Sequence, residues 1–272
     1  MSYIRAENLV KRYGDGDAAV TAVRGVSFGI ERGEFVAVMG ESGSGKSTLL
    51  SMMGALNTPT AGTYEVDEME VYRLDQDRQA DFRREFLGFV FQSFHLVPYL
   101  SVLENVMLPL VTQRAPGKEK RARAEEALSR VGLAAKGHRL PGQISGGEQE
   151  RVAIARAVVN GPPILLADEP TGNLDTRTSG GVMELLRTLN GEGMTIIMVT
   201  HSRECASHSR RILRIADGCL IEDARQAPPE RTVRPSVDTG LMSPGCGSGA
   251  IDSAVLSPDT GKRPKPYDLT GV

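Results

Sequence analysis

The chain has 272 residues, of which 40% are hydrophobic, and a net charge of −2, a composition typical of a soluble globular protein. The near-neutral charge disfavours a protein that binds nucleic acid, because basic surfaces drive such binding. No apolar run reaches the roughly 18 residues of a membrane-spanning helix, and the N-terminal residues lack the apolar segment of a signal peptide. We therefore expect a cytoplasmic protein that acts on a membrane only through a partner.

The N-terminal part of the chain is predicted to contain strands and one helix around a glycine-rich turn. Residues 4–9, 20–30 and 34–39 have the apolar, β-rich composition of strands, and glycine-containing turns separate them. Phe35–Met39 is a continuous apolar run, as expected of a strand that is buried on both faces. Because residues 47–56 have helical composition, this part predicts a strand–loop–helix unit.

The middle of the chain, residues 92–160, reads mainly as helix. The segment 119–131 is amphipathic, because Lys and Arg residues occupy one of its faces. The opposite, apolar face carries Ala124, Ala127, Leu128 and Val131.

Further strands are predicted towards the C-terminus. Residues 164–167 and 195–200 read as buried strands with a helix at 179–189 between them. Asp217-Gly218 separates two short strands and predicts a hairpin, whose strands cover residues 211–215 and 219–222.

The last part of the sequence differs in composition from the rest. Residues 227–272 hold seven of the 15 prolines and six glycines, with few large apolar side chains, and are predicted to form a disordered tail. The cysteines Cys205, Cys219 and Cys246 show neither metal-binding nor redox spacing, which suits a reducing compartment.

The glycine-rich segment after the strand at 34–39 carries the clearest chemistry. It has the spacing G-x-x-x-x-G-K-[ST], in which backbone N–H groups and the start of a helix attract phosphate oxygens. Lys46 would reach the β- and γ-phosphates of a nucleotide, and the Ser47 hydroxyl would bind Mg²⁺. The predicted phosphate-binding residues are Gly40, Glu41, Ser42, Gly43, Ser44, Gly45, Lys46, Ser47 and Thr48.

Two carboxylates follow the buried strand at 164–167. Asp168 is suited to Mg²⁺, whereas Glu169, one residue on, would orient and deprotonate an attacking water. An Asp-Glu pair after a strand is also a common cap or turn, but the upstream phosphate loop favours catalysis. His201 ends the strand at 195–200, at the sheet edge where parallel sheets bind ligands, and is predicted to sense the γ-phosphate.

The residue types alone leave Gln92 undecided. It follows a short apolar run, so it could cap a strand, or its amide could contact Mg²⁺ or the attacking water. His95, His138 and His208 have no comparable position, and no role is assigned to them.

With the segment Ile144-Ser-Gly-Gly-Glu-Gln-Glu-Arg151, these motifs resemble the ATP-binding cassette family over about residues 3–223. The resemblance implies that Tyr13 stacks on adenine and that Gln92 links the nucleotide and its Mg²⁺ to a membrane partner. Asp175, in Gly-Asn-Leu-Asp, would cross a dimer interface. The signature residues that would close over ATP held by a second copy are Ser145, Gly146, Gly147 and Glu148. The common signature is Leu-Ser-Gly-Gly-Gln, so Ile144 and Glu148 depart from it.

The fold implied by the resemblance is α/β. It comprises a P-loop NTPase core with a parallel sheet, an N-terminal antiparallel β subdomain and an α-helical signature subdomain. The cassette would span residues 1–226, with the helical subdomain at about 93–160 inserted in the core.

The implied activity is ATP hydrolysis, with Glu169, His201 and Lys46 as catalytic residues and Ser47, Gln92 and Asp168 around Mg²⁺. Two copies would enclose two ATP molecules and drive an integral membrane permease from the inner face of the cell membrane. No nucleic acid partner is expected.

Two further segments, 94–109 and 170–175, are similar to the group that includes lipoprotein-release and macrolide-export ATPases. This similarity favours export, lipoprotein release or mechanotransmission. Residues 94–110 would receive a coupling helix of the permease, although their apolar side chains could equally belong to the core. The alternative function is an ATPase that regulates a cell-wall or cell-division complex without moving a solute.

Overall fold

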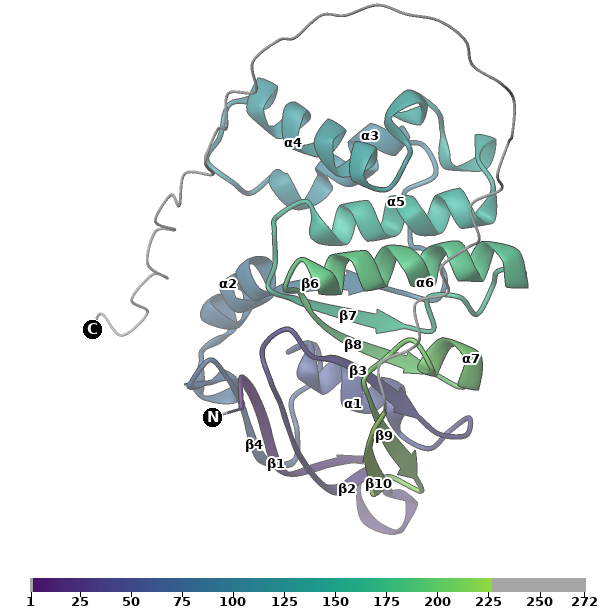
Figure 1. Ribbon diagram of the computed structural model, residues 1–272. Coiled ribbons are helices and arrows are strands. Elements are labelled where there is room, and N and C mark those ends of the chain that lie inside the picture. Colours follow the sequence, from purple (N-terminus) through teal and green to yellow (C-terminus); the bar gives the residue numbers. More distant parts are fainter. Residues whose placement is uncertain (1, 227–272) are drawn as a thin grey trace, which may run out of the picture. The chain divides into compact units, whose positions relative to one another are not determined.

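The computed structural model describes residues 2–226, so the tail predicted for 227–272 lies outside the described residues. The larger of two sheets has the strand order β10-β9-β3-β8-β7-β6 (Figure 1). All of its neighbouring strands run parallel except β10, which pairs antiparallel with β9. Its strands are β3 (Phe35–Met39), β6 (Leu87–Val90), β7 (Ile164–Asp168), β8 (Thr195–Thr200), β9 (Arg211–Ala216) and β10 (Cys219–Arg225).

The smaller sheet is antiparallel and has the order β2-β1-β4-β5. Strand β4 pairs with β1 from Ile4↔Val66 to Val10↔Ala61, so the chain returns to this sheet after the first helix. Its strands are β1 (Ile4–Tyr13), β2 (Val20–Ile30), β4 (Ala61–Val66) and β5 (Met69–Glu70).

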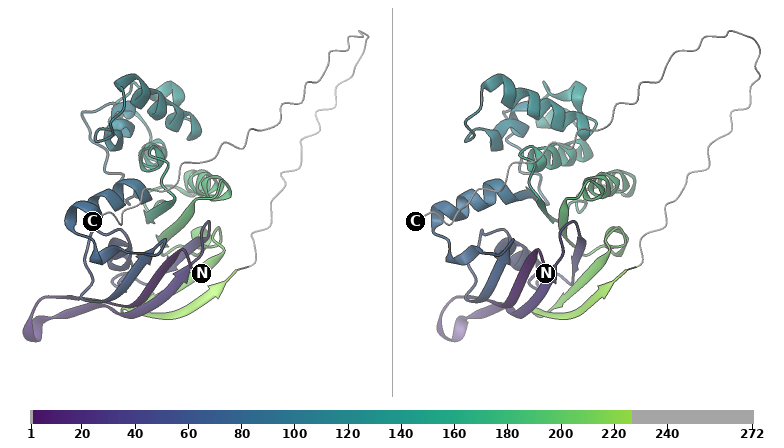
Figure 2. Two further views of the ribbon diagram at one scale, coloured as in Figure 1. Left: turned by 90° about the vertical axis from the view of Figure 1, so that its left-hand side faces the viewer. Right: turned by 60° about the vertical axis from the view of Figure 1, so that its left-hand side comes forward.

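The helices form three groups, apart from one helix that leads into β6. Helix α1 (Lys46–Met53) packs with the residues between the two sheets, and α6 (Thr176–Gly191) and α7 (Arg203–Ala206) cover the other face of the larger sheet. Helix α2 (Gln76–Phe86) leads into β6. The third group, which Figure 2 shows extending from the sheet edge, is α3 (Val102–Met107), α4 (Gly117–Arg130) and α5 (Gly146–Val158).

The central strands are buried on both faces, as their apolar runs predict. Alternate residues of β3 enter different cores: Phe35, Ala37 and Met39 pack towards α5 and α6, and Val36 and Val38 pack towards α1. Strands β7 and β8 divide their residues in the same way. The parallel sheet is therefore sandwiched between two hydrophobic cores, and the predicted α/β architecture is confirmed.

Several element boundaries differ from the sequence-based expectations. Residues 91–101 contain no helix, so helical structure within the 92–160 segment begins only at Val102. Helix α1 ends at Met53 rather than near residue 56, because Gly54 packs closely on the Phe89 ring and Ala55 adopts a positive φ of 50°. Among residues 2–226, no helix is both long and apolar enough to cross a lipid bilayer.

The C-terminal hairpin is present as predicted. Asp217 and Gly218 connect β9 and β10 with φ values of 47° and 78°. Two consecutive positive φ values are typical of a type I′ turn, whose twist matches that of the paired strands. A Cβ at position 218 would also lie 2.8 Å from the carbonyl oxygen of Ala22, so glycine is required on steric grounds.

A buried arginine joins the two sheets at the start of β9. Arg211 is 8% exposed, and its Nε and Nη2 donate to both carboxylate oxygens of Asp223 at 2.6 and 2.7 Å. Its Nη1 donates to the carbonyl oxygen of Gly29 on β2 at 2.7 Å and lies 3.3 Å from Glu34. One guanidinium therefore satisfies acceptors from both sheets.

Replacing Arg211 with alanine should lower the free energy of unfolding by about 3 kcal/mol, because two acidic groups and a carbonyl lose their buried partner. Urea denaturation measures this change. The control is Arg225→Ala, which breaks an ion pair with Glu31 whose side chains are 71% and 68% exposed. That variant should lose less than about 1 kcal/mol. Equal losses in the two variants would show that Arg211 contributes no more than a surface ion pair.

Candidate functional site

The loop at residues 40–48 joins β3 to α1, and we call it the phosphate loop. Gly45 precedes the first residue of α1 with a φ of 100°, and a Cβ there would lie 2.3 Å from the carbonyl oxygen of Ala22. A Cβ at Gly40 would lie 2.1 Å from the carbonyl oxygen of Ile215. Because the backbone packs closely on other backbone at these two glycines, a side chain would not fit at either position, which is typical of a phosphate-binding turn.

The phosphate loop lines a cavity of about 670 Å³ together with His201 and two arginines. Because Glu41 and Asp217 also line this cavity, its walls carry charges of both signs. The lining residues are Met39, Gly40, Glu41, Ser42, Gly43, Ser44, His201, Arg203, Arg214, Ile215, Ala216, Asp217 and Ile221.

The last residues of the phosphate loop, which begin helix α1, place one cation and one hydroxyl. Lys46 is 7% exposed, and its Nζ donates to the carbonyl oxygen of Glu41 at 2.6 Å, so the ammonium group lies inside the loop. The Ser47 hydroxyl donates to Asp168 Oδ1 at 3.2 Å. Burial raises the pKa of Asp168, and the Ser47 hydrogen bond partly offsets this effect. Adjacent hydroxyl and carboxylate oxygens are ligands that Mg²⁺ prefers, so these two residues fit the predicted ion.

Glu169 and His201 meet at the ends of neighbouring strands. The distance from His201 Nδ1 to Glu169 Oε1 is 2.9 Å, and the Glu169 side chain is 13% exposed. Glu169 has a positive φ of 49°, and its N–H donates to the carbonyl oxygen of Val199 on β8. A positive φ is uncommon for a residue other than glycine, and here the residue that adopts it contacts the histidine.

Gln92, at the end of β6, belongs to the same sheet edge. Its carbonyl oxygen accepts from Asn173 Nδ2 at 2.7 Å. A Cβ at Gly172 would lie 3.2 Å from Gln92 Nε2 and 3.4 Å from Glu169 Cβ, so both residues approach Gly172. The role of Gln92, strand capping or contact with Mg²⁺ or the attacking water, stays a prediction.

Tyr13 ends β1 and pairs with Val20 on β2. Its ring is 44% exposed, its hydroxyl bonds with Asn57, and Lys11 Nζ lies 5.1 Å from the ring centroid. Strand β2 also supplies the Ala22 carbonyl that packs on the phosphate loop. Tyr13 therefore belongs to the same strand pair that packs on the phosphate loop, and its stacking on adenine stays a prediction.

The signature residues begin helix α5. Ser145 is the N-cap: its Oγ accepts from the N–H of Glu148 at 3.3 Å, and Glu148 Oε2 accepts from the N–H of Ser145 at 3.0 Å. This reciprocal pair is a capping box, which fixes the first turn of the helix. The other carboxylate oxygen of Glu148 forms an ion pair with Lys136, a residue that the sequence did not single out.

The signature packs directly on the loop that carries Asp175. A Cβ at Gly147 would lie 2.0 Å from Thr178 Cγ2, so only glycine allows α5 to approach α6 this closely. Asp175 is the N-cap of α6 and accepts from the N–H and hydroxyl of Thr178 at 3.0 and 2.6 Å, and the hydroxyl bond lowers its pKa. Both motifs border a cavity of about 520 Å³ lined by Gly132, Leu133, Ser145, Gly147, Glu148, Arg151, Asp175, Arg177, Thr178 and Gly181.

Some of the predicted site residues line two different cavities. The phosphate loop and His201 line one cavity, Ser145, Gly147, Glu148 and Asp175 line the other, and the two cavities share no lining residue. Within one copy, the signature therefore borders a different cavity from the phosphate loop.

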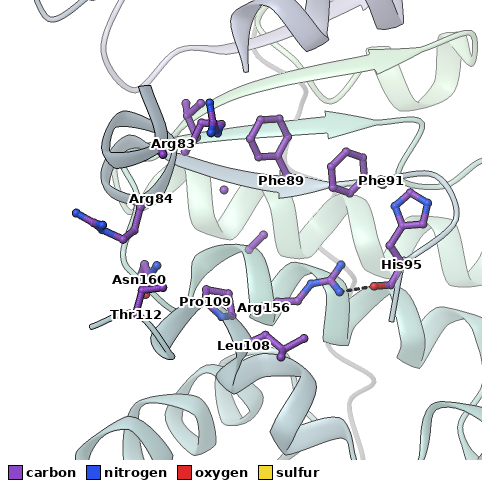
Figure 3. Close-up of a pocket in the computed structure, with 14 residues that line it drawn as sticks. Arg83, Arg84, Phe89, Phe91, His95, Leu108, Pro109, Thr112, Arg156 and Asn160 are labelled. Carbon is purple, nitrogen blue, oxygen red and sulfur yellow. Dashed lines mark hydrogen bonds between the residues drawn. The ribbon is translucent and has the colours of Figure 1, made fainter. Parts of the chain in front are cut away.

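A third cavity, of about 530 Å³, lies between the sheet edge and the helical group (Figure 3). Arg156 on α5 points into it and donates to the carbonyl oxygens of Phe94 and His95 at 2.7 and 2.5 Å. Both residues have positive φ values, of 59° and 47°. The lining residues are Ala80, Arg83, Arg84, Leu87, Gly88, Phe89, Phe91, His95, Leu108, Pro109, Thr112, Arg156, Ala157 and Asn160.

Helix α5 also buries a carboxyl group. Glu150 is 0% exposed, and neither of its carboxylate oxygens has a hydrogen-bond partner among the described residues. Burial raises its pKa to about 8, and the nearby Arg156 opposes this shift. Sequence inspection gave no sign of this group, because an isolated Glu on a helix is usually exposed.

A phosphate loop between a buried strand and a helix, with two carboxylates at the end of a parallel strand, defines a nucleoside triphosphatase of the P-loop class. Residues 23–172 match the ABC transporter family. The chain therefore belongs to this family, in which it is an ATP-binding cassette ATPase.

Relatives with curated names are longer than this chain. The macrolide export ATP-binding/permease proteins MacB of Mannheimia succiniciproducens and Neisseria meningitidis serogroup B are 44% and 45% identical to it, over 86% and 84% of its length. The matched part is only 36% and 35% of those proteins. The chain thus spans about a third of the length of these relatives.

Solved cassettes match nearly end to end. The dimeric ATP-binding cassette MJ0796 bound to ADP and Pi has a TM-score of 0.76 and 42% identity, covering 82% of this chain and 98% of that one. The cbiO1 protein from Clostridium perfringens, part of the ABC transporter complex cbiONQ, has a TM-score of 0.75 and 30% identity, covering 82% and 88%. These likenesses support the predicted fold class in all three of its parts.

Replacing Glu150 with glutamine should stabilise the protein most at neutral and higher pH. Since the pKa is raised from 4.5 to about 8, folding takes up a proton, and stability is lost as the pH rises between these values. The variant should gain about 1–3 kcal/mol at pH 7 relative to the wild type, and little at pH 4.5. Urea denaturation from pH 4.5 to 8.5 measures this difference.

The matched control is Glu126→Gln on the exposed face of α4. It should follow the wild-type pH dependence. A Glu150→Gln gain that is the same at every pH would contradict the role of ionisation.

Proposed function

We propose that two copies of this cassette enclose two ATP molecules. Each ATP would lie between the phosphate loop of one copy and the signature residues 145–148 of the other. The observation that carries this proposal is the division of the site residues between two cavities without a shared lining residue. A half-site that has no use within one copy is explained by a second copy. The name of the solved relative, a dimeric post-hydrolysis state, supports the same arrangement.

Hydrolysis follows from the groups at the ends of β7 and β8. Glu169 would take a proton from water as the water oxygen attacks the γ-phosphorus and the bond to the β–γ bridging oxygen breaks. His201, held 2.9 Å from Glu169, would donate to the γ-phosphate. Lys46 would balance the charge that develops on the leaving diphosphate. Ser47, Asp168 and Gln92 would hold Mg²⁺, which neutralises phosphate charge when bound.

The chain would drive a membrane permease. The MacB relatives are named ATP-binding/permease proteins, and this chain covers only their cassette-sized part. The third cavity offers an attachment surface, because Phe91, Leu108 and Pro109 provide apolar area and Arg83 and Arg84 provide charge (Figure 3). Of the apolar residues of 94–110, Val102, Leu103, Val106 and Leu110 belong to the buried core, whereas Tyr99 is 79% exposed and Leu108 is 37% exposed. A coupling helix seated here would place the cassette at the inner face of the membrane, for export, lipoprotein release or mechanotransmission.

Replacing Glu169 with glutamine should lower ATP hydrolysis by at least about a hundredfold, because the general base is lost. ATP binding should persist, so the variant should accumulate as a dimer in ATP and Mg²⁺. Phosphate release and light scattering measure the two effects. The control, Glu184→Gln, removes a carboxylate that is 69% exposed on α6 and should leave both unchanged.

Replacing Ser145 with arginine provides the complementary measurement. The bulky cation should abolish hydrolysis and dimer formation while the monomer retains nucleotide affinity, because Ser145 serves the ATP of the other copy. A Glu169→Gln variant that stays monomeric in saturating ATP would overturn the dimer. A large loss of ATP affinity in the Ser145→Arg monomer would show that the signature contacts the ATP of its own copy, which contradicts the proposal.

Replacing Leu108 with arginine should weaken membrane attachment, because a cation would enter the apolar part of the third cavity. We expect the amount of the chain that stays bound to isolated native membranes to fall several-fold. Substitutions at the centre of an interface often cost more than about 1 kcal/mol of binding free energy, which corresponds to such a decrease. Leu56→Arg, at an exposed residue beyond α1, is the control and should remain attached. Retention of both variants would exclude the cavity as the attachment surface.

A further inference from the structure

The signature of this chain carries a negative charge where the common family signature has a neutral glutamine. Glu148 is the third residue of α5, next to Gly147 and one turn from Ser145. A carboxylate in the first turn stabilises the helix, but it also opposes the positive potential that attracts a phosphate to the helix N-terminus. An anion arriving at Ser145 would therefore meet an unfavourable charge.

Lys136 occupies the position that removes this problem. It ends the short 3-10 helix Ala134–Lys136, and its Nζ pairs with Glu148 Oε1. The other carboxylate oxygen, Oε2, accepts from the N–H of Ser145 at 3.0 Å. The lysine hydrogen bond lowers the pKa of Glu148, so the carboxylate stays ionised at neutral pH and its charge can be cancelled only by a cation.

The same contacts orient the Ser145 hydroxyl. Its oxygen already accepts from the N–H of Glu148 at 3.3 Å, and no described group takes its proton. The hydroxyl can therefore donate to a phosphate oxygen while the capping box stays intact. Folding stability alone does not explain the pair, because the side chains of Lys136 and Glu148 are 33% and 26% exposed, and such ion pairs contribute little.

We propose that Lys136 is a positioning residue for the ATP of the second copy. It cancels the charge of Glu148 and fixes that carboxylate against the backbone of Ser145, so that the serine hydroxyl meets the phosphate without repulsion from this carboxylate. This inference rests on the proposed ATP-enclosing dimer.

The test measures the ATP concentration at which half of the chain is dimeric, in the Glu169→Gln background. Lys136→Gln should raise this concentration about tenfold at low salt, because each of the two sites gains an uncompensated negative charge. The increase should shrink in 0.5 M salt, where charges are screened within about 4 Å. Lys136→Arg should restore dimerisation.

The decisive comparison removes both charges. Between Glu148→Gln and Lys136→Gln/Glu148→Gln, the loss of the lysine should change the concentration by less than about twofold, since no carboxylate remains to be neutralised. Arg121→Gln is the matched control: it breaks an exposed ion pair with Glu125 on α4 and should leave the concentration unchanged.

The outcomes separate this inference from the proposed function. If the Glu169→Gln chain never dimerises with ATP, the dimer itself is wrong. If it dimerises and Lys136→Gln leaves the half-dimerisation concentration of ATP unchanged, the charge-cancelling role is overturned. The same holds if Lys136→Gln raises this concentration equally with Glu148 and with Gln at position 148. A defect that persists in high salt, or that Lys136→Arg does not rescue, would likewise contradict it.

Discussion

The arrangement of this site depends on the burial of β3, β7 and β8 on both faces. Since each strand sends alternate side chains into two different cores, none can shift by one residue without exchanging its entire packing. Parallel pairing then fixes the three carboxyl ends at one edge of the sheet. The phosphate loop, Asp168, Glu169 and His201 follow these ends, so hydrophobic packing positions groups that are polar and far apart in sequence.

Much of this architecture could be predicted from local patterns. Apolar runs identified β3, β7 and β8, and Asp217-Gly218 identified the hairpin, because these signals depend on neighbouring residues only. Strand β4 carried no comparable signal: Ala61–Val66 includes a glycine, and its pairing with β1 depends on a contact distant in sequence. Helix α2 was also unassigned, because only Phe82 of its residues is buried and the rest resembles a charged surface segment.

The candidate site divides along the same line. Motif residues such as Lys46 and Ser145 have a spacing that can be read from the chain, and their roles remain predictions. Their supporting partners cannot be read in this way, because the partners come from distant segments. Lys136 is 12 residues from Glu148, Arg156 is 61 residues from His95, and Asn173 is 81 residues from Gln92. Only the folded chain brings these pairs together.

Helix α5 connects two of the cavities. Ser145 caps its start beside one cavity, and Arg156, near its end, holds the Phe94–His95 carbonyls at another. At 1.5 Å per residue, these positions are about 16 Å apart along the helix axis. A hydrogen-bonded helix barely compresses along its axis. A displacement of the Phe94 and His95 carbonyl groups would therefore tilt helix α5 or break their hydrogen bonds with Arg156. Helix α5 therefore connects the third cavity to the signature, so a displacement of one end of the helix would move the other.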